Sequence, residues 1–159
     1  MELYVDLQIA TQDQRSLPEQ QQLETWIRAA IQAGRHELPD EAELTVRIVD
    51  NDEIQALNYQ YRGKDKPTNV LSFPFENPPG ITLPLLGDLV ISKMVVEREA
   101  TEQNKQLISH WAHMLIHGTL HLLGYDHINE EEAITMEGIE TKLMIELGFN
   151  APYLNQESK

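Results

Sequence analysis

Alternating apolar and polar residues predict four β-strands in this chain. Side chains on a strand point to opposite faces in turn, so a half-buried strand is apolar at every second position. Leu44, Val46 and Ile48 show this alternation, with polar residues between them. Other segments alternate in part or form short apolar runs. The predicted strands are residues 3–10, 43–49, 68–73 and 86–92.

Apolar residues at helical spacing predict five helices. Residues three or four positions apart share one face of an α-helix. A stripe of this kind runs from Leu23 to Ile31, after the helix-opening pair Pro18-Glu19. The predicted helices are residues 19–33, 51–61, 93–103, 107–123 and 130–147. The glycines expected to end three of them are Gly34, Gly124 and Gly148.

The segments between these elements predict a single domain over residues 1–159. Residues 76–84 contain three prolines and one glycine, so we expect a loop that could act as a mobile flap. Residues 151–159 are expected to form a frayed tail. Strands interleaved with helices predict an α+β or α/β fold, in which helices pack on one sheet.

Composition narrows the classes of protein that remain. The chain has no cysteine, so any metal ion must be held by nitrogen and oxygen ligands. Residues 1–6 lack the basic and apolar regions of a signal peptide, and no apolar run approaches the ~20 residues that span a bilayer. We therefore expect a soluble, cytoplasmic protein. A formal net charge of -14 works against nonspecific attraction to nucleic acid.

Three histidines predict a metal site near the end of the fourth helix. His117 and His121 are four residues apart, so their side chains point the same way, one turn apart. Gly124 is expected to end the helix and let the chain fold back, which would bring His127 toward the pair. Three histidine ligands leave a fourth tetrahedral position open, as in catalytic zinc sites, where bound water can have a pKa of about 7.

The neighbours of these histidines suggest further roles. His110 and His113 lie earlier on the same helix and could line a cleft, join a hydrogen-bond network or simply pack. Asp126 could orient a ligand imidazole, hold water or cap the turn, and Tyr125 is expected to pack. Zinc peptidases carry glutamate directly after the first histidine of the pair, whereas this chain has Gly118, which argues against ordinary peptide hydrolysis.

A basic segment forms a second candidate site. Arg62, Lys64 and Lys66 lie in a predicted turn between a helix and a strand. Such a turn can grip phosphate, and arginine can do so with two hydrogen bonds, although composition alone favours a solvated turn. A metal ion beside a cationic loop would suit phosphodiester chemistry, because both neutralise developing negative charge.

Three segments together resemble the bacterial YbeY family of metal-dependent endoribonucleases. Residues 117–127 read His-Gly-x-x-His-Leu-x-Gly-Tyr-Asp-His. Residues 61–74 read Tyr-Arg-Gly-Lys-Asp-Lys-Pro-Thr-Asn-Val-Leu-Ser-Phe-Pro, and residues 86–91 read Leu-Gly-Asp-Leu-Val-Ile. The resemblance extends over nearly the whole chain.

The resemblance implies a zincin-like α+β domain with a four-stranded mixed sheet and about five helices. It implies one Zn²⁺ per chain on His117, His121 and His127, and a role for Arg62 at the cut, with Lys64 and Lys66 as further RNA-binding candidates. It also implies a zinc-dependent, single-strand-specific endoribonuclease acting in maturation of the 3′ end of 16S ribosomal RNA and in ribosome quality control. Implied partners are the small ribosomal subunit, a ribosomal protein and an assembly GTPase.

Parts of the mechanism and two other functions remain open from the sequence. Asp126 and His113 are candidates for the general base of a ribonuclease, which the residues do not otherwise identify. One alternative is another metallohydrolase, such as an amidohydrolase or peptidase. The other is a ribosome-assembly factor with mainly structural zinc, which a fourth protein ligand would favour.

Overall fold

Four strands form one mixed sheet in the computed structural model, which describes residues 1–35, 39–81 and 83–153. The strands are β1 (Glu2–Ile9), β2 (Glu41–Val49), β3 (Val70–Pro74) and β4 (Leu85–Ser92). They lie in the order β1-β2-β4-β3, so β1 and β3 are the edge strands. β1, β2 and β4 are mutually parallel, whereas β3 runs antiparallel to β4. The predicted four-stranded mixed sheet is confirmed.

Five helices accompany this sheet in the described residues, as the α+β prediction required. They are α1 (Gln20–Gly34), α2 (Asn51–Arg62), α3 (Lys93–Glu102), α4 (Leu107–Leu122) and α5 (Glu130–Glu146). Gly124 and Gly148 follow the last two helices with φ of 103° and 92°, a left-handed backbone that favours glycine. None of the described helices is long and apolar enough to cross a membrane.

Gly34 differs from its prediction. It is the last residue within α1 and does not have the left-handed backbone of a helix-ending glycine. A Cβ atom at this position would meet Leu123 Cδ1 at 2.7 Å. The close approach of α1 to the end of α4, and not a turn, therefore favours glycine at this position, since a larger residue would require Leu123 to shift.

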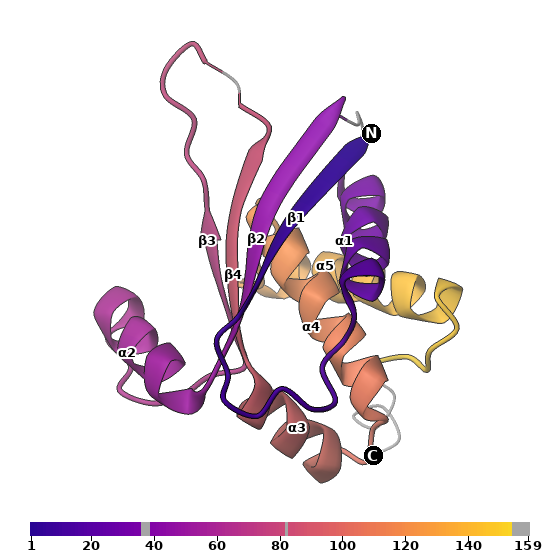
Figure 1. The fold of residues 1–159 in the computed structure, drawn as a ribbon. Coiled ribbons are helices and arrows are strands. Elements are labelled where there is room, and N and C mark those ends of the chain that lie inside the picture. Colours follow the sequence, from indigo (N-terminus) through magenta and orange to yellow (C-terminus); the bar gives the residue numbers. More distant parts are fainter. Residues whose placement is uncertain (36–38, 82, 154–159) are drawn as a thin grey trace.

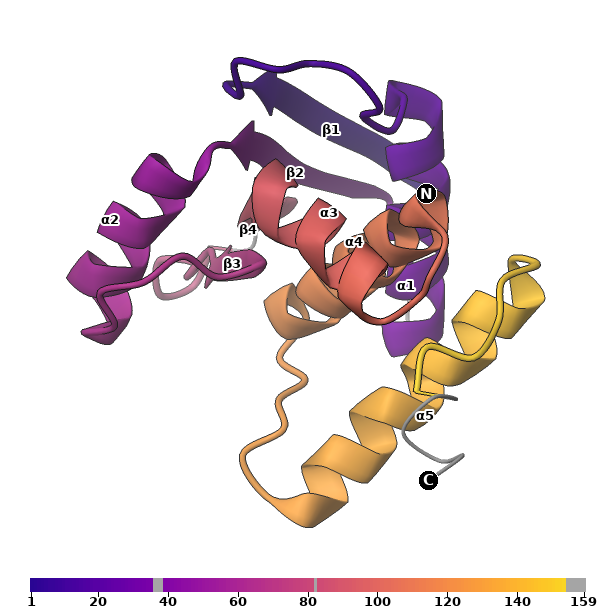
Figure 2. The same ribbon diagram turned by 90° about the horizontal axis from the view of Figure 1, so that it is seen from below.

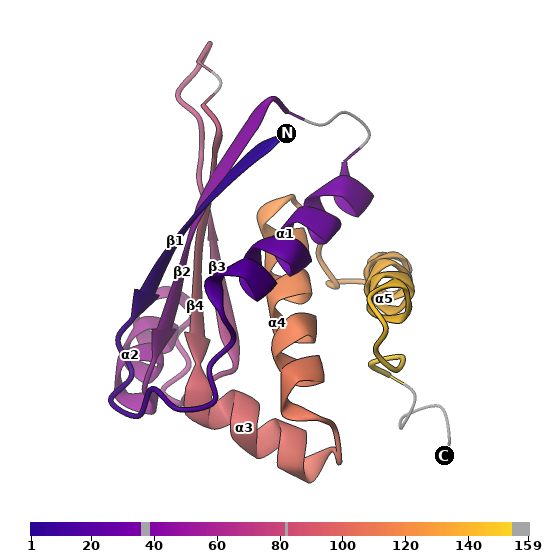
Figure 3. The same ribbon diagram turned by 45° about the vertical axis from the view of Figure 1, so that its right-hand side comes forward.

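The helices divide between the two faces of the sheet. α1 and α4 cover one face, and α5 packs outside α4 (Figure 2 and Figure 3). Successive residues of β4 show the division, because Leu89 and Ile91 belong to the large core on this side. Val90 points the other way, into a smaller core with Ile54 of α2 and Leu71 of β3.

α4 is the central helix and positions the candidate site. Most of its residues are buried, and Trp111, Leu115 and Leu120 are at most 1% exposed. Gly118 lets the helix approach the sheet closely, because a Cβ atom there would meet Leu89 Cδ2 at 2.9 Å and Val70 Cγ2 at 3.3 Å. A peptidase-like glutamate at position 118 would therefore require Leu89 and Val70 to shift.

The described parts of the predicted loop, residues 76–81 and 83–84, lie between β3 and β4 and project beyond the sheet (Figure 1). The backbone N–H of Phe75 donates to the carbonyl oxygen of Leu86 at 2.9 Å, so strand-like pairing continues into the connection. The mobility of this flap stays a prediction. Of the predicted tail, residues 154–159 lie outside the described part of the chain.

Candidate metal centre

The three predicted histidines lie together at one end of α4. The ring centroids of His117 and His121 are 4.6 Å apart, and His127 lies 5.8 Å and 5.2 Å from these two rings. One nitrogen atom from each imidazole falls within 4.8 Å of the other two. The group can hold one metal ion.

The spacing of the facing nitrogens fits zinc. The Nε2 atoms of His117 and His121 are 3.2 Å apart. Two nitrogens that each lie about 2.0–2.1 Å from one tetrahedral zinc ion are about 3.4 Å from one another. Burial, and then the neighbouring imidazoles, lower the pKa of His121, which favours the neutral ring that a metal needs.

The turn after α4 brings His127 to the pair. Gly124 and Tyr125 donate backbone hydrogen bonds to the carbonyl oxygens of His121 and Leu120, each at 3.0 Å, which closes the helix. The Tyr125 hydroxyl donates to the carbonyl oxygen of Gly34 at 2.9 Å and so ties the turn to α1.

Asp126 stabilises this turn. Its Oδ1 atom accepts a hydrogen bond from the backbone N–H of His127 at 2.7 Å. That contact corresponds to the turn-capping alternative considered for this residue. Asp126 also lines the cleft beside the three histidines. Its roles in orienting a ligand imidazole or holding water stay predictions.

A buried carboxylate from α5 supports the first ligand. Glu140 is 0% exposed, and its Oε1 atom accepts hydrogen bonds from His113 Nε2 at 2.5 Å, His117 Nδ1 at 3.1 Å and the Tyr153 hydroxyl at 3.0 Å. Burial by itself would raise the pKa of Glu140. The hydrogen bonds from His113 and His117 outweigh burial and hold that pKa at about 2.

An ionised Glu140 fixes the tautomer of His117. A carboxylate only accepts hydrogen bonds, so Nδ1 of His117 must carry the proton. Nε2 then keeps its lone pair and faces Nε2 of His121. A carboxylate that accepts from a metal-binding histidine is the arrangement that commonly orients zinc ligands in proteins.

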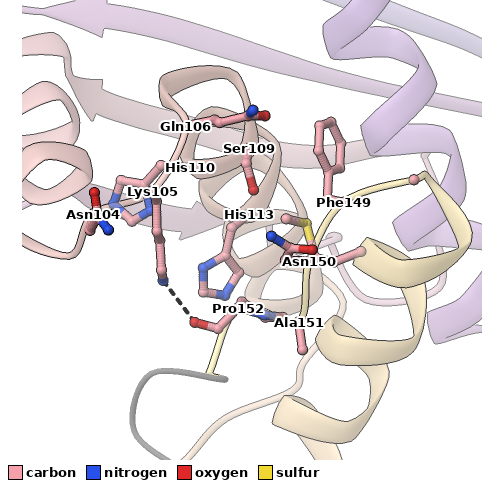
Figure 4. A pocket seen from close by; sticks show the side chains of 12 residues that line it. Asn104, Lys105, Gln106, Ser109, His110, His113, Phe149, Asn150, Ala151 and Pro152 are labelled. Atoms are coloured by element: carbon pink, nitrogen blue, oxygen red, sulfur yellow. Dashed lines mark hydrogen bonds between the residues drawn. The ribbon is translucent and has the colours of Figure 1, made fainter. Parts of the chain in front are cut away.

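His113 and His110 face a different cavity. Figure 4 shows both rings in a pocket of about 320 Å³ between α4 and the segment that follows α5, with Lys105 beside them. His110 Nε2 donates to Glu99 at 2.9 Å, and His113 donates to Glu140. His113 does not line the metal cleft, and its contacts are those of a residue that holds Glu140 in place.

The cleft that contains the three histidines measures about 1030 Å³ and extends to the basic segment. Arg62, in the last turn of α2, lines it, whereas Lys64 and Lys66 do not. Gly63 ends α2 with φ of 69°. The structure therefore brings Arg62 to the same cleft as the histidines and leaves the two lysines on the exposed turn beyond it.

Sequence reasoning missed Glu140 and Tyr153. Glu140 occupies a position on the apolar stripe of α5, four residues after Met136 and three before Leu143, both of which are buried. A carboxylate where the pattern expects a core residue was the available signal, because such a group must find a partner when it is buried. Tyr153 follows the last helix and carries no such signal.

Comparisons with known proteins agree with this geometry. A model of the family described as Endoribonuclease YbeY matches residues 8–148. The chain belongs to the YbeY family. A relative from Psychromonas ingrahamii, named endoribonuclease YbeY, is 63% identical over 157 residues, which cover 99% of this chain and 99% of the relative.

A solved structure has a similar fold. The solution structure of TM1509 from Thermotoga maritima is 28% identical in sequence, with a TM-score of 0.57, over 96% of this chain and 92% of that one. Membership of the YbeY family and the predicted fold class are thus confirmed. The metal ligands, by contrast, rest on the geometry of His117, His121 and His127.

Proposed function

We propose that this protein is a zinc-dependent endoribonuclease that cuts single-stranded RNA and matures the 3′ end of 16S ribosomal RNA. The observation that carries the proposal is one cleft lined by both a three-histidine group and Arg62. Membership of the YbeY endoribonuclease family supports RNA as the substrate. A part in ribosome quality control belongs to the same proposal.

His117, His121 and His127 would hold one zinc ion. When bound, zinc supplies Lewis acidity, which stabilises negative charge on phosphate oxygens. Glu140 keeps the His117 ring in the orientation and tautomer that binding requires. The group has three ligands in the described residues. A tetrahedral ion would then have a fourth position open for water or substrate, which supports a catalytic site over a structural one.

Arg62 would bind the phosphate next to the cut. Its side chain is exposed and makes no hydrogen bond or ion pair with the described residues, so all its donors are available. A guanidinium can donate two parallel hydrogen bonds to one phosphate and neutralise charge that grows during the reaction. Asp126 lines the same cleft and remains a candidate base, whereas His113 faces the second pocket.

The overall acidity of the protein defines how RNA would be engaged. A net charge of -14 makes long stretches of phosphate backbone unfavourable partners. RNA would therefore enter as a short unpaired segment at the cleft, presented by the small ribosomal subunit. A ribosomal protein and an assembly GTPase complete the proposed partners, and the cytoplasm is the proposed location.

Two variants test this function with highly purified protein and single-stranded ribosomal RNA. His121→Ala should lower zinc content and abolish cleavage, as a chelator should for the unaltered protein. Arg62→Glu should keep zinc and the fold but lose cleavage. Full zinc occupancy in His121→Ala would defeat the ligand assignment, and unchanged cleavage by Arg62→Glu would reduce Arg62 to a helix-end residue. A product with a 2′,3′-cyclic phosphate would rule out direct attack by water.

A further inference from the structure

The cleft bends around the edge strand β3. Val70 and Ser72 face α4, since Val70 lies against Gly118 and the Ser72 hydroxyl donates to the carbonyl oxygen of Gly118 at 3.3 Å. Leu71 and Phe73 alternate with them and point to the opposite face, toward α2. All four residues line the cleft, so it runs from the histidines on one face to α2 on the other.

An aromatic pair occupies the far end of this cleft. Tyr61, in the last turn of α2, meets Phe73 edge-to-face, with ring centroids 5.0 Å apart and an interplanar angle of 67°. Phe73 packs on the smaller core that includes Ile54 and Leu71, which anchors its ring. Tyr61 remains 60% exposed, and its hydroxyl makes no hydrogen bond with the described residues. A large aromatic ring is thus held in place while most of its surface faces solvent.

We propose that Tyr61 and Phe73 form a stacking platform for one unpaired RNA base, beside the phosphate that Arg62 would bind. This inference rests on the proposed ribonuclease function and names the part of the site that selects single strands. Aromatic rings stack with any base, since every base has a π-face, and each stacked base contributes substantially to binding. A base in a duplex is already stacked and paired, so it cannot offer its face without unpairing.

Charge makes such a platform necessary. The protein carries a net charge of -14, so counterion release from many phosphates cannot supply its affinity for RNA. Stacking does not depend on cations and adds binding where few are present. Arg62 follows Tyr61 directly in the chain and lines the same cleft, so a base on Tyr61 and its phosphate on Arg62 would be held together.

Binding of an oligonucleotide that is recovered uncut after the measurement tests the platform. The probe is a short single-stranded RNA with 2′-O-methyl riboses and one 2-aminopurine base, whose fluorescence falls on stacking. The unaltered zinc-loaded protein should quench it. Tyr61→Ala should lose the quenching and bind about 5- to 100-fold more weakly, whereas Tyr61→Phe should keep both. Phe73→Leu, which keeps bulk but removes the ring, should weaken quenching as well.

Tyr59→Ala is the matched control. Tyr59 is 61% exposed on the same helix but does not line the cleft, so its loss should leave binding and quenching unchanged. A duplex of the same sequence should bind weakly to every variant. Unchanged quenching and affinity in Tyr61→Ala would overturn the platform. So would normal oligonucleotide binding together with lost association with the small ribosomal subunit, because that result assigns the pair to a protein contact.

A cleavage assay distinguishes failure of the stacking platform from failure of the proposed ribonuclease function. If the unaltered protein cuts single-stranded RNA in a zinc-dependent way and Tyr61→Ala cuts equally well with equal affinity, only the platform fails. If the unaltered protein neither binds nor cuts single-stranded RNA, the proposed function fails and the platform fails with it.

Discussion

Replacing Glu140 with glutamine removes the negative charge beneath His117 and keeps the shape of the side chain. The amide oxygen can still accept from His113, His117 and Tyr153, whose donor atoms lie 2.5–3.1 Å from Oε1 of the glutamate. The amide nitrogen would take the place of Oε2, which is buried without a partner in the described residues. The substitution therefore weakens charge-assisted hydrogen bonds and buries an unpaired donor.

The magnitude follows from the pKa of Glu140. A fall from 4.5 to about 2 means that the folded protein favours the ionised carboxylate by about 3 kcal/mol. Loss of that interaction in Glu140→Gln should lower the melting temperature of the metal-free protein by about 6–12 °C for a domain of this size. A weaker partner for His117 should also reduce zinc affinity by about 10- to 100-fold.

Thermal unfolding of the metal-free protein and zinc competition against a chromogenic chelator measure the two effects separately. Glu146→Gln is the control, because Glu146 is an exposed residue at the end of the same helix and should change neither quantity by much. If Glu140→Gln matches the unaltered protein in both melting temperature and zinc affinity, the reasoning about a buried charge that orients His117 is refuted.

Two further predictions concern packing and pH. Gly118→Ala should destabilise the protein by about 1–3 kcal/mol in urea unfolding, since its Cβ would lie 2.9 Å from Leu89, whereas Gly138→Ala, with open space around it, should stabilise by up to about 1 kcal/mol. If the two substitutions changed the free energy of unfolding equally, α4 would be able to move away from the sheet, and the close packing at Gly118 would not limit the side chain there. Burial acts to raise the pKa of Glu99, but hydrogen bonds, the strongest from His110, lower it below 4.5. Glu99 therefore stabilises the fold above pH 4.5 and loses that effect as the pH falls below it, so Glu99→Gln should flatten the acid limb of a stability–pH curve; an unchanged limb would contradict this.

The parts of the molecule that local sequence encodes were predicted well. Sequence patterns located all five described helices, and the predicted strands lie within two residues of the observed ends. The common direction of the His117 and His121 side chains depends only on helical spacing. Gly124 indicates the turn after α4, because its left-handed backbone favours glycine. These features need no knowledge of which segments meet in space.

Features that depend on long-range contacts were not predictable in the same way. Glu140 lies 23 residues after His117, and only the packing of α5 on α4 brings them together. The contacts of His113 with Glu140 and with the segment after α5 depend on that same packing. Helix α1 does end at Gly34, as predicted, but without the left-handed backbone of a helix-ending glycine, and the atom that crowds this position belongs to Leu123 at the end of α4.

An unfolded chain still carries its three histidines within the eleven residues from His117 to His127. Closing so short a loop removes little chain entropy, so the unfolded polypeptide itself acts as a flexible zinc chelator. A metal raises stability only by the difference between its affinities for the folded and unfolded states. If the site binds zinc as proposed, the ion will thus protect this fold less than its affinity for the native protein implies, and a chain emerging during synthesis could take it up before α5 and Glu140 are in place.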